Sequence, residues 1–484
     1  MKKLTDILKN TPVREVCGDT AAAIGGLVYD SRAVKPGDCF FAVPGTQSDG
    51  HDYIPMAVEK GAAAIVCERM PADAAEGVAY VLVGDSAGAM ADMAAAFYDY
   101  PSRELKLVGI TGTNGKTTTA TLLYDLVRAM GYKAGLISTV VYKIDGREVE
   151  ATHTTPDSIR LNAMMREMAD AGCAYCFMEC SSHAIVQERT RGLDFAGGIF
   201  SNITHDHLDY HKTFAEYIRA KKLFFDGLPK GAFALTNADD RNGRVMVQNT
   251  AAAVSAYSLR AMADFRCKIV EMHLDGMLLR IDGQELWVGL LGRFNAYNLL
   301  AVYGAAALLG LDRGEVLRVL SMLHAVSGRF EKIRAANGTT AIVDYAHTPD
   351  ALENVIQTIE EIRTPGQQLI VVCGCGGDRD RTKRPEMAAI AVKYATTAVF
   401  TSDNPRHESP EAILDDMVAG LESGARYLRI ADRAEAIRTA VMLSRPGDII
   451  LVAGKGHETY QIVGDVKHPF DDREEIKKRF ALLN

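Results

Sequence analysis

The sequence predicts an α/β protein of three domains: a small N-terminal α/β domain, a central domain with a mostly parallel sheet, and a C-terminal Rossmann-like domain. The chain has 484 residues, whereas an ordinary domain has about 100 to 200. From residue 105 onward, short apolar runs alternate with helical stretches. This alternation is typical of parallel strands joined by helices that cover both faces of the sheet.

Composition narrows the possible function classes before any motif is considered. The chain has 54 Lys and Arg residues against 62 Asp and Glu, a formal net charge of −8 that argues against nucleic acid as a partner. No apolar run is long enough for membrane insertion, and Asp6 and Lys9 interrupt the only stretch that resembles a secretory signal. Nine cysteines, an odd number, in a large chain with no visible export signal favour the reducing cytoplasm. We also expect a monomer.

Residues 1–101 form the first predicted domain. Its Ala- and Met-rich stretch Met90–Tyr98 predicts a helix, and Tyr100–Ser102 predicts a linker to the next domain. Short apolar runs bounded by turn residues predict strands at Leu27–Tyr29, Cys39–Val43 and Ala63–Cys67.

Residues 102–326 form the second predicted domain. The apolar run Leu105–Ile110 predicts a strand, and apolar side chains on one face of Thr118–Met130 predict the helix that follows it. Two further predicted strands, Tyr175–Cys180 and Gly197–Asn202, each run directly into a polar cluster. This order predicts a parallel sheet with polar side chains gathered at the carboxyl ends of its strands.

The pattern changes again near Ser327–Phe330, and residues 327–484 form the third predicted domain. Helical stretches at Asp350–Ile362 and Pro410–Leu421 separate its apolar runs, which is typical of a doubly wound fold. The predicted strands are Thr340–Asp344, Leu369–Cys373, Ala398–Thr401 and Ile449–Val452.

A Gly-rich loop, Thr111–Thr118, lies between the first predicted strand and helix of the central domain. Free N–H groups and the helix dipole at such a position hold phosphates, so we identify a P-loop and a P-loop ATPase-like domain. The usual P-loop has glycine where Ile110 stands, so this loop is a variant. Lys116 is placed to neutralise the β- and γ-phosphates and Thr117 to bind Mg²⁺. A Gly-rich turn with an exposed lysine is the alternative.

Polar residues after two neighbouring strands predict a metal site beside the P-loop. Glu179 ends one strand, and the cluster Thr204–His211 follows another. A carboxylate and an imidazole beside a nucleotide favour Mg²⁺ or Mn²⁺, with a zinc site or isolated surface histidines as alternatives. Two cysteine pairs lack the second half of a zinc site, and we expect buried thiols there: Cys173 with Cys176, and Cys373 with Cys375.

Four motifs follow one another along the chain: Gly112–Thr118, Glu179–His183, Asp206–His211 and Asp344–Pro349. Together they resemble the motifs of the Mur ligases, the ATP-dependent amino-acid-adding enzymes of peptidoglycan synthesis. Two more, Asp403–Arg406 and Gly454–Glu458, are similar to those of the branch that adds meso-diaminopimelate. The resemblance spans the whole chain, and it implies three partners: ATP, meso-diaminopimelate and a UDP-N-acetylmuramoyl-dipeptide.

The resemblance also implies roles for individual residues, beginning with an N-terminal domain that holds the UDP end of its substrate. Positions matching contacts to the UDP-substrate are Ser31, Thr154, Thr155, Ser181, Gln187 and Arg189. Positions matching ATP contacts are Gly112, Thr113, Asn114, Gly115, Lys116, Thr117, Thr118, Asn295, Asn298, Arg329 and Asp344. Positions matching diaminopimelate contacts are Arg379, Asp403, Asn404, Pro405, Arg406, Gly454 and Glu458.

For catalysis, the resemblance implies Lys116 together with ligands for two Mg²⁺ ions. The implied metal ligands are Thr117, Glu179, His207 and Lys221, the last as a carbamate formed with CO₂. Taken alone, several of these positions have plainer interpretations. Lys222 is the adjacent alternative to Lys221, Asn295 is a possible helix cap, and Asp30–Ala33 is a possible polar turn.

The implied reaction turns the D-glutamyl γ-carboxylate into an acyl phosphate, which the amine of meso-diaminopimelate attacks to form an amide. Guanidinium groups at Arg406 and Arg379 would bind the carboxylates of the incoming amino acid. The alternatives are a ligase of the same superfamily that adds L-lysine to this acceptor or glutamate to folate. A nucleotide-switch ATPase, which needs no acceptor, is a third.

Overall fold

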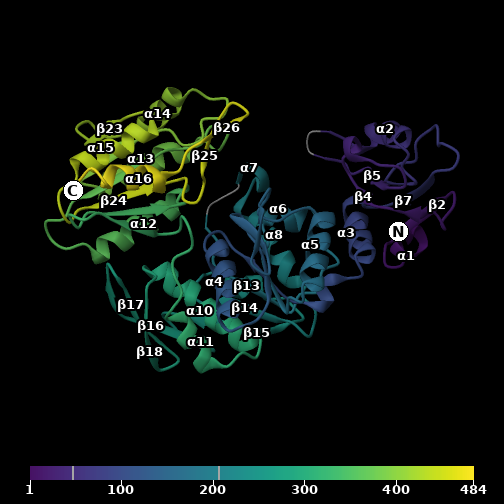
Figure 1. Ribbon diagram of the computed structural model, residues 1–484, viewed down its shortest axis with the longest axis horizontal. Helices are drawn as coiled ribbons and strands as arrows, with labels where there is room; N and C mark the ends of the chain where they lie inside the picture. The colour runs from purple at the N-terminus through teal and green to yellow at the C-terminus, as the bar shows by residue number, and fades with distance from the viewer. Residues whose placement is uncertain (46–47, 205–207, 484) are drawn as a thin grey trace.

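The computed structural model describes residues 1–45, 48–204 and 208–483, and it confirms an α/β fold with three large sheets (Figure 1). The three sheets use strands within residues 13–83, 106–288 and 331–453. The N-terminal unit, drawn in purple, and the C-terminal unit, drawn in green and yellow, lie on opposite sides of the central unit. Within the described residues, no helix combines the length and the apolar character that crossing a membrane requires.

The N-terminal sheet has the strand order β2-β7-β6-β5-β4, and only β2 runs antiparallel to its neighbour. Its strands are β2 (Val13–Cys17), β4 (Leu27–Val28), β5 (Cys39–Phe41), β6 (Ala64–Cys67) and β7 (Ala79–Val83). Accompanying elements are β1 (Lys2–Lys3), β3 (Ala23–Ile24), α1 (Leu4–Ile7), α2 (Ile54–Glu59) and α3 (Ser86–Phe97). Helix α3 begins four residues before the predicted start because the Asp85 carboxylate caps it by accepting the Gly88 N–H at 3.0 Å.

The central sheet has eleven strands in the order β11-β10-β9-β12-β8-β13-β14-β15-β16-β17-β18. Seven adjacent strands are parallel: β9 (Ala134–Ile137), β12 (Tyr175–Glu179), β8 (Lys106–Thr111), β13 (Gly197–Phe200), β14 (Phe233–Asn237), β15 (Ala253–Ser258) and β16 (Phe265–His273). Antiparallel strands extend both edges: β10 (Val141–Ile144), β11 (Arg147–Glu150), β17 (Gly276–Ile281) and β18 (Gln284–Val288). We did not predict these edge hairpins.

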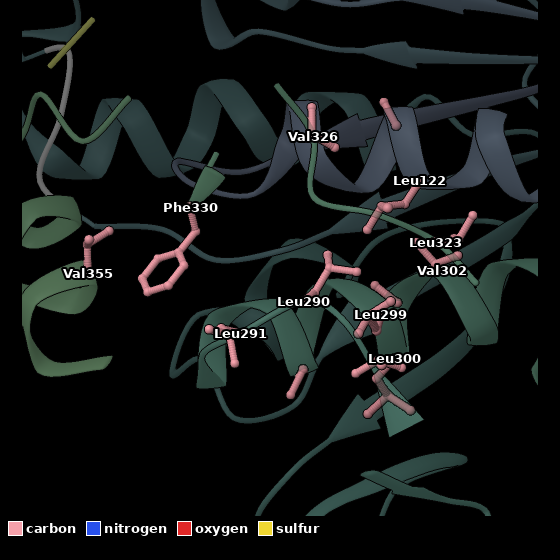
Figure 2. Packing of buried hydrophobic residues seen from close by; sticks show 14 of the residues in the cluster. Leu122, Leu290, Leu291, Leu299, Leu300, Val302, Leu323, Val326, Phe330 and Val355 are labelled. Atoms are coloured by element: carbon pink, nitrogen blue, oxygen red, sulfur yellow. The ribbon is translucent and has the colours of Figure 1, made fainter. Parts of the chain in front are cut away.

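Helices cover both faces of the central sheet. They are α4 (Lys116–Ala129), α5 (Ser158–Asp170), α6 (Ser182–Val186), α7 (Leu208–His211), α8 (Phe214–Asp226), α9 (Gly243–Met246), α10 (Arg293–Leu308) and α11 (Arg313–Leu320). Figure 2 shows Leu299, Leu300 and Val302 of α10 beside Leu122 of α4. The same apolar cluster continues to Phe330 of the C-terminal unit, so the two units share a core.

The C-terminal sheet has the order β19-β20-β24-β21-β22-β23, with β19 antiparallel and the others parallel. Its strands are β19 (Glu331–Arg334), β20 (Thr340–Asp344), β21 (Leu369–Cys373), β22 (Thr397–Phe400), β23 (Tyr427–Arg429) and β24 (Ile449–Ala453). Its helices and hairpin strands are α12 (Pro349–Ile362), α13 (Lys383–Tyr394), α14 (Pro410–Val418), α15 (Arg433–Leu443), β25 (Tyr460–Val463), β26 (Val466–Pro469) and α16 (Asp472–Phe480). Helix α14 ends three residues before the predicted end.

Candidate active site

The P-loop lies at the carboxyl end of β8, between the ends of β12 and β13. The register pairs Glu179 with Ile110 and Phe200 with Thr111, so all three strands end at the same level. Asn202, just after β13, accepts the Thr113 N–H through its backbone oxygen at 2.8 Å. Its Oδ1 accepts the Asn114 N–H at 2.9 Å. The predicted meeting of P-loop and strand ends is therefore present in the described residues.

Two glycines of the loop cannot be replaced without displacing its neighbours. A Cβ at Gly112 would lie 2.0 Å from the Ser201 hydroxyl oxygen, and one at Gly115 would lie 2.5 Å from Asn298 Oδ1. Gly115 also has φ +86°, a conformation that disfavours a side chain. Because Gly115 ends the loop in this conformation, α4 begins at Lys116, two residues earlier than predicted.

Two lysines converge on the P-loop. Lys116 Nζ donates to the backbone oxygens of Gly112 at 2.9 Å and Thr113 at 2.8 Å. Lys221, on α8, is 1% exposed and donates from Nζ to the Gly112 oxygen at 2.7 Å. Lys222 turns away and pairs with Asp226 at 2.5 Å, because consecutive residues of a helix point about 100° apart. Of the two candidate lysines on α8, Lys221 is the one that reaches the nucleotide loop.

Glu179 supplies a buried carboxylate at the end of β12. It is 1% exposed, and Oε1 accepts the Thr139 N–H at 2.7 Å. His207 lies outside the described residues, and within those residues no three His, Cys, Asp or Glu side chains gather as a metal site. The donors that are described, the Glu179 carboxylate and the Thr117 hydroxyl at the start of α4, are hard oxygen ligands that suit Mg²⁺.

A cavity of about 340 Å³ lies between the central and C-terminal units. Predicted ATP-site residues that line it are Asn114, Gly115, Thr118, Asn298, Arg329 and Asp344. A hydrogen bond connects the two units beside this cavity, because Asn114 Nδ2 of the P-loop donates to Asp350 Oδ2 at 2.9 Å. Asp350 is the second residue of α12, in its first turn, and was not among the predicted site residues.

Arg329 and Asp344 form the C-terminal wall of this cavity. Arg329 donates from Nη2 to the Thr117 hydroxyl oxygen at 3.2 Å, and its Nε is buried with no hydrogen-bond partner among the described residues. Asp344 accepts the N–H groups of Phe330 at 2.7 Å and Ala346 at 2.8 Å. Burial raises the pKa of Asp344, while Arg329 and the two N–H groups oppose that shift. A guanidinium with an unused buried donor suits an anionic ligand.

Asn295 is the third residue of α10 and does not cap this helix. The helix is preceded by Gly292 at its N-cap, and no side chain caps it there. Asn295 Nδ2 donates to the Leu291 oxygen at 2.7 Å, and its Oδ1 accepts from Asn298 Nδ2 at 3.1 Å. Asn295 therefore orients Asn298, which lines the cavity.

The predicted substrate contacts of the central unit form one connected cluster. The Thr155 hydroxyl donates to the Glu179 backbone oxygen at 2.7 Å and lies 3.4 Å from the Ser181 hydroxyl. Arg189 donates to the Thr155 oxygen at 2.7 Å and to Gln187 Oε1 at 2.6 Å. The cluster thus adjoins Glu179. The fifth member, Thr154, accepts from the Thr139 hydroxyl at 3.0 Å.

Ser31 is buried in the N-terminal unit, where it begins a 3₁₀ turn at Ser31–Ala33 that the Asp30 side chain caps. The polar-turn interpretation of this motif is therefore correct as to its structure. Tyr29, two residues before Ser31, lies close enough to the central unit for charges there to shift its pKa. Burial and the Asp157 carboxylate raise the pKa of Tyr29, and the Arg189 guanidinium opposes them.

The loops after β21 and β22 bring two guanidinium-bearing side chains together, because a Cβ at Gly376 would lie 3.0 Å from Arg406 Nη1 and 3.8 Å from Arg379 Cγ. Arg406 has φ +49°, and its Nη1 donates to the Gly377 oxygen at 2.8 Å. Burial lowers the pKa of Arg406, and the positive charge of exposed Arg379 lowers it further. Two cations held this close favour an anionic ligand.

Two carboxylates near this arginine pair, Glu458 and Asp403, differ in their hydrogen-bond partners. Glu458 Oε2 accepts from Lys455 Nζ at 2.8 Å and from Asn404 Nδ2 at 2.9 Å, so its charge is already balanced. Lys455 is fully buried and was not predicted, although its place between two glycines was visible. Asp403 has no such cation at hydrogen-bond distance in the described part of the chain. A Cβ at Gly454 would lie 2.6 Å from Asp403 Oδ2.

Comparison with known proteins decides the family. Family models match residues 23–98 (Mur ligase family, catalytic domain), 110–306 (Mur ligase middle domain) and 328–456 (Mur ligase, glutamate ligase domain). The chain belongs to the Mur ligase family. The resemblance inferred from the motifs is confirmed.

Individual Mur ligases match over nearly the whole chain. It is 55% identical to the UDP-N-acetylmuramoyl-L-alanyl-D-glutamate--2,6-diaminopimelate ligases of Phocaeicola vulgatus, over 481 residues, and Bacteroides fragilis, over 482, covering 99% of both chains each time. A solved structure of a ligase of this name has 31% identity and a TM-score of 0.71, covering 100% of this chain and 99% of that one. Folylpolyglutamate synthase of Mycobacterium tuberculosis shares the fold, with 18% identity, a TM-score of 0.62 and coverage of 75% and 91%.

Proposed function

We propose that this Mur ligase adds meso-diaminopimelate to the D-glutamyl γ-carboxylate of UDP-N-acetylmuramoyl-L-Ala-D-Glu. It is an ATP-dependent amide-forming ligase of peptidoglycan synthesis, as its family and its relatives at 55% identity indicate. The observation that carries the choice of amino acid is the pair Arg406 and Arg379, which lie in the loops after the neighbouring strands β22 and β21 and both approach Gly376.

The chemistry begins with a carboxylate, which is a poor electrophile at neutral pH. Its oxygen attacks the γ-phosphorus of ATP, ADP leaves, and the resulting acyl phosphate has a good leaving group. Lys116 and the N–H groups at the start of α4 stabilise the negative charge that spreads over the phosphoryl oxygens. The amine then attacks the acyl carbon, and phosphate leaves as the amide forms.

Metal ligands in this proposal are Thr117, Glu179, His207 and a carbamate on Lys221. The structure supports Lys221 through its burial and its contact with the Gly112 oxygen, 2.7 Å away. Mg²⁺ held there would neutralise the phosphates of ATP. A carbamate replaces the lysine cation by an anionic oxygen ligand, which explains why a lysine would lie among metal ligands.

Tyr345 lies near both the cavity proposed to hold ATP and the arginine pair proposed to hold diaminopimelate. Tyr345 lines the cavity between the central and C-terminal units. Burial raises the pKa of Tyr345, and the negative charges of Glu458 and Asp403 raise it further. An amino acid held by Arg406 therefore lies near the end of the cavity that holds ATP. The Thr155 and Arg189 cluster beside Glu179 would hold the muramoyl-dipeptide so that its carboxylate meets the γ-phosphate.

Specificity follows from the second carboxylate of diaminopimelate. L-lysine lacks it, so a lysine bound in the same pose would leave a desolvated guanidinium unpaired. A guanidinium that substrate binding desolvates and leaves unpaired costs about 2 to 5 kcal/mol. We therefore expect the enzyme to discriminate strongly against lysine.

Release of ADP tests the proposed function. It is measured with meso-diaminopimelate, L-lysine or L-glutamate, each with and without the UDP-muramoyl-dipeptide. We expect release only when diaminopimelate and the dipeptide are both present. ADP release without an acceptor would instead support a nucleotide switch, and a preference for lysine or glutamate would support the other ligases.

A further inference from the structure

Two loops of the C-terminal unit carry the arginine pair, and they lie directly against each other. One follows β21 and contains Gly377 and Arg379, and the other follows β22 and contains Arg406. The Gly377 N–H donates to the Asn404 oxygen at 2.9 Å, and Arg406 returns a bond to the Gly377 oxygen at 2.8 Å. A Cβ at Gly377 would lie 1.9 Å from the Pro405 oxygen, so the approach leaves no room for a side chain.

A buried ion pair underlies this contact. Arg384, on α13, has a side chain that is 0% exposed, and its guanidinium binds both carboxylate oxygens of Glu408, at 2.8 and 3.0 Å. The same guanidinium donates to the Gly376 oxygen at 3.2 Å and to Asp416 at 2.8 Å. Arg384 thereby holds a residue of the first loop and a residue of the second at once.

Glu408 connects the two loops a second time, through a backbone N–H of the first loop. It lies two residues after Arg406, and its Oε1 accepts the Asp378 N–H, next to Arg379, at 2.6 Å. The bonds from Arg384 lower the pKa of Glu408 to about 2, so the carboxylate is ionised at neutral pH. Arg406 itself has the unfavourable φ of +49°, a conformation that its surroundings must hold in place.

We propose that Arg384 and Glu408 are positioning residues that set the separation of Arg379 and Arg406, and with it the selectivity for an amino acid carrying a second carboxylate. Neither residue needs to touch the substrate. A fork of two guanidiniums recognises a carboxylate only within a narrow geometry, and a misplacement of about 1 Å at a site can cost about a hundredfold in rate. This inference rests on the proposed function, because it presumes that diaminopimelate is the amino acid bound.

The test compares Glu408→Gln and Arg384→Lys with the control Glu411→Gln. Glu411 lies on α14 and pairs with Arg429 at 2.6 Å, so the control removes a similar carboxylate from the same unit without touching either loop. We measure KM for diaminopimelate, KM for ATP, the ratio of kcat/KM for diaminopimelate over lysine, and the temperature of unfolding.

We expect both test variants to raise KM for diaminopimelate about tenfold or more and to lower the diaminopimelate-to-lysine ratio, with KM for ATP within about twofold of wild type. The control should match wild type in all four quantities. Unchanged KM and ratio in folded variants would overturn the inference, as would an equal rise in both KM values, which a general loss of structure produces. Failure of the wild-type enzyme to use diaminopimelate would instead refute the proposed function.

Discussion

Replacing Lys221 with alanine is expected to reduce turnover by about a hundredfold or more, which is typical of the loss of a group that stabilises transition-state charge. The Lys221 side chain is buried and contacts the Gly112 oxygen at 2.7 Å, in the loop proposed to hold the phosphates. If its active form is a carbamate, added short carboxylates such as formate or acetate should restore part of the activity. Steady-state ADP release with and without these anions measures both effects.

Lys222→Ala is the matched control for this experiment. Lys222 is the next residue of α8, and it pairs with Asp226 of the same helix. We expect this variant to keep wild-type turnover. Full activity of Lys221→Ala would eliminate a catalytic role. A loss that no carboxylate restores, in a variant that still binds ATP, would indicate that Lys221 acts as an ammonium group that supports the loop.

Arg406→Ala is expected to raise KM for diaminopimelate by about thirtyfold or more while leaving KM for the UDP-muramoyl-dipeptide nearly unchanged. Arg406 is partly desolvated and lies near Arg379, so removing it takes away half of the cationic site. Because the unpaired guanidinium is also what disfavours lysine, the kcat/KM ratio between the two amino acids should move toward one. Initial rates at varied amino-acid concentration measure both quantities.

Two further variants keep this result interpretable. Arg406→Lys retains the charge without the planar fork, and we expect KM between those of wild type and the alanine variant. Arg429→Ala removes a more exposed arginine of the same unit, paired with Glu411 and Asp415, and should leave KM unchanged. Wild-type KM for diaminopimelate in Arg406→Ala would refute the specificity argument.

Much of the fold was predictable because local patterns agree with the final packing. The strands Thr340–Asp344 and Leu369–Cys373 were predicted residue for residue, since short apolar runs bounded by polar residues are typical of buried parallel strands. The antiparallel edges were missed, although Asp145-Gly146 and Asp282-Gly283 are two-residue turns with positive φ and therefore a recognisable hairpin signal.

The site residues also differ in whether local sequence patterns predict them. Residues in contiguous motifs, such as Lys116 and Glu179, were predictable because spacing after a strand fixes their place. Lys455, Asp350 and Glu408 were not, because their roles come from contacts across loops or across units. The Asp350 carboxylate, for instance, meets Asn114 over a separation of 236 residues. No local pattern reports a pairing of that range.

We propose that the P-loop and its neighbouring strand ends make the substrate carboxylate attack the γ-phosphate of ATP. Transfer of ¹⁸O tests it most directly. A UDP-muramoyl-dipeptide with both γ-carboxylate oxygens labelled is turned over with ATP and diaminopimelate, and the phosphate and the amide product are analysed by mass spectrometry. We predict one ¹⁸O atom in each phosphate and the other in the amide. Phosphate without label would contradict the claim.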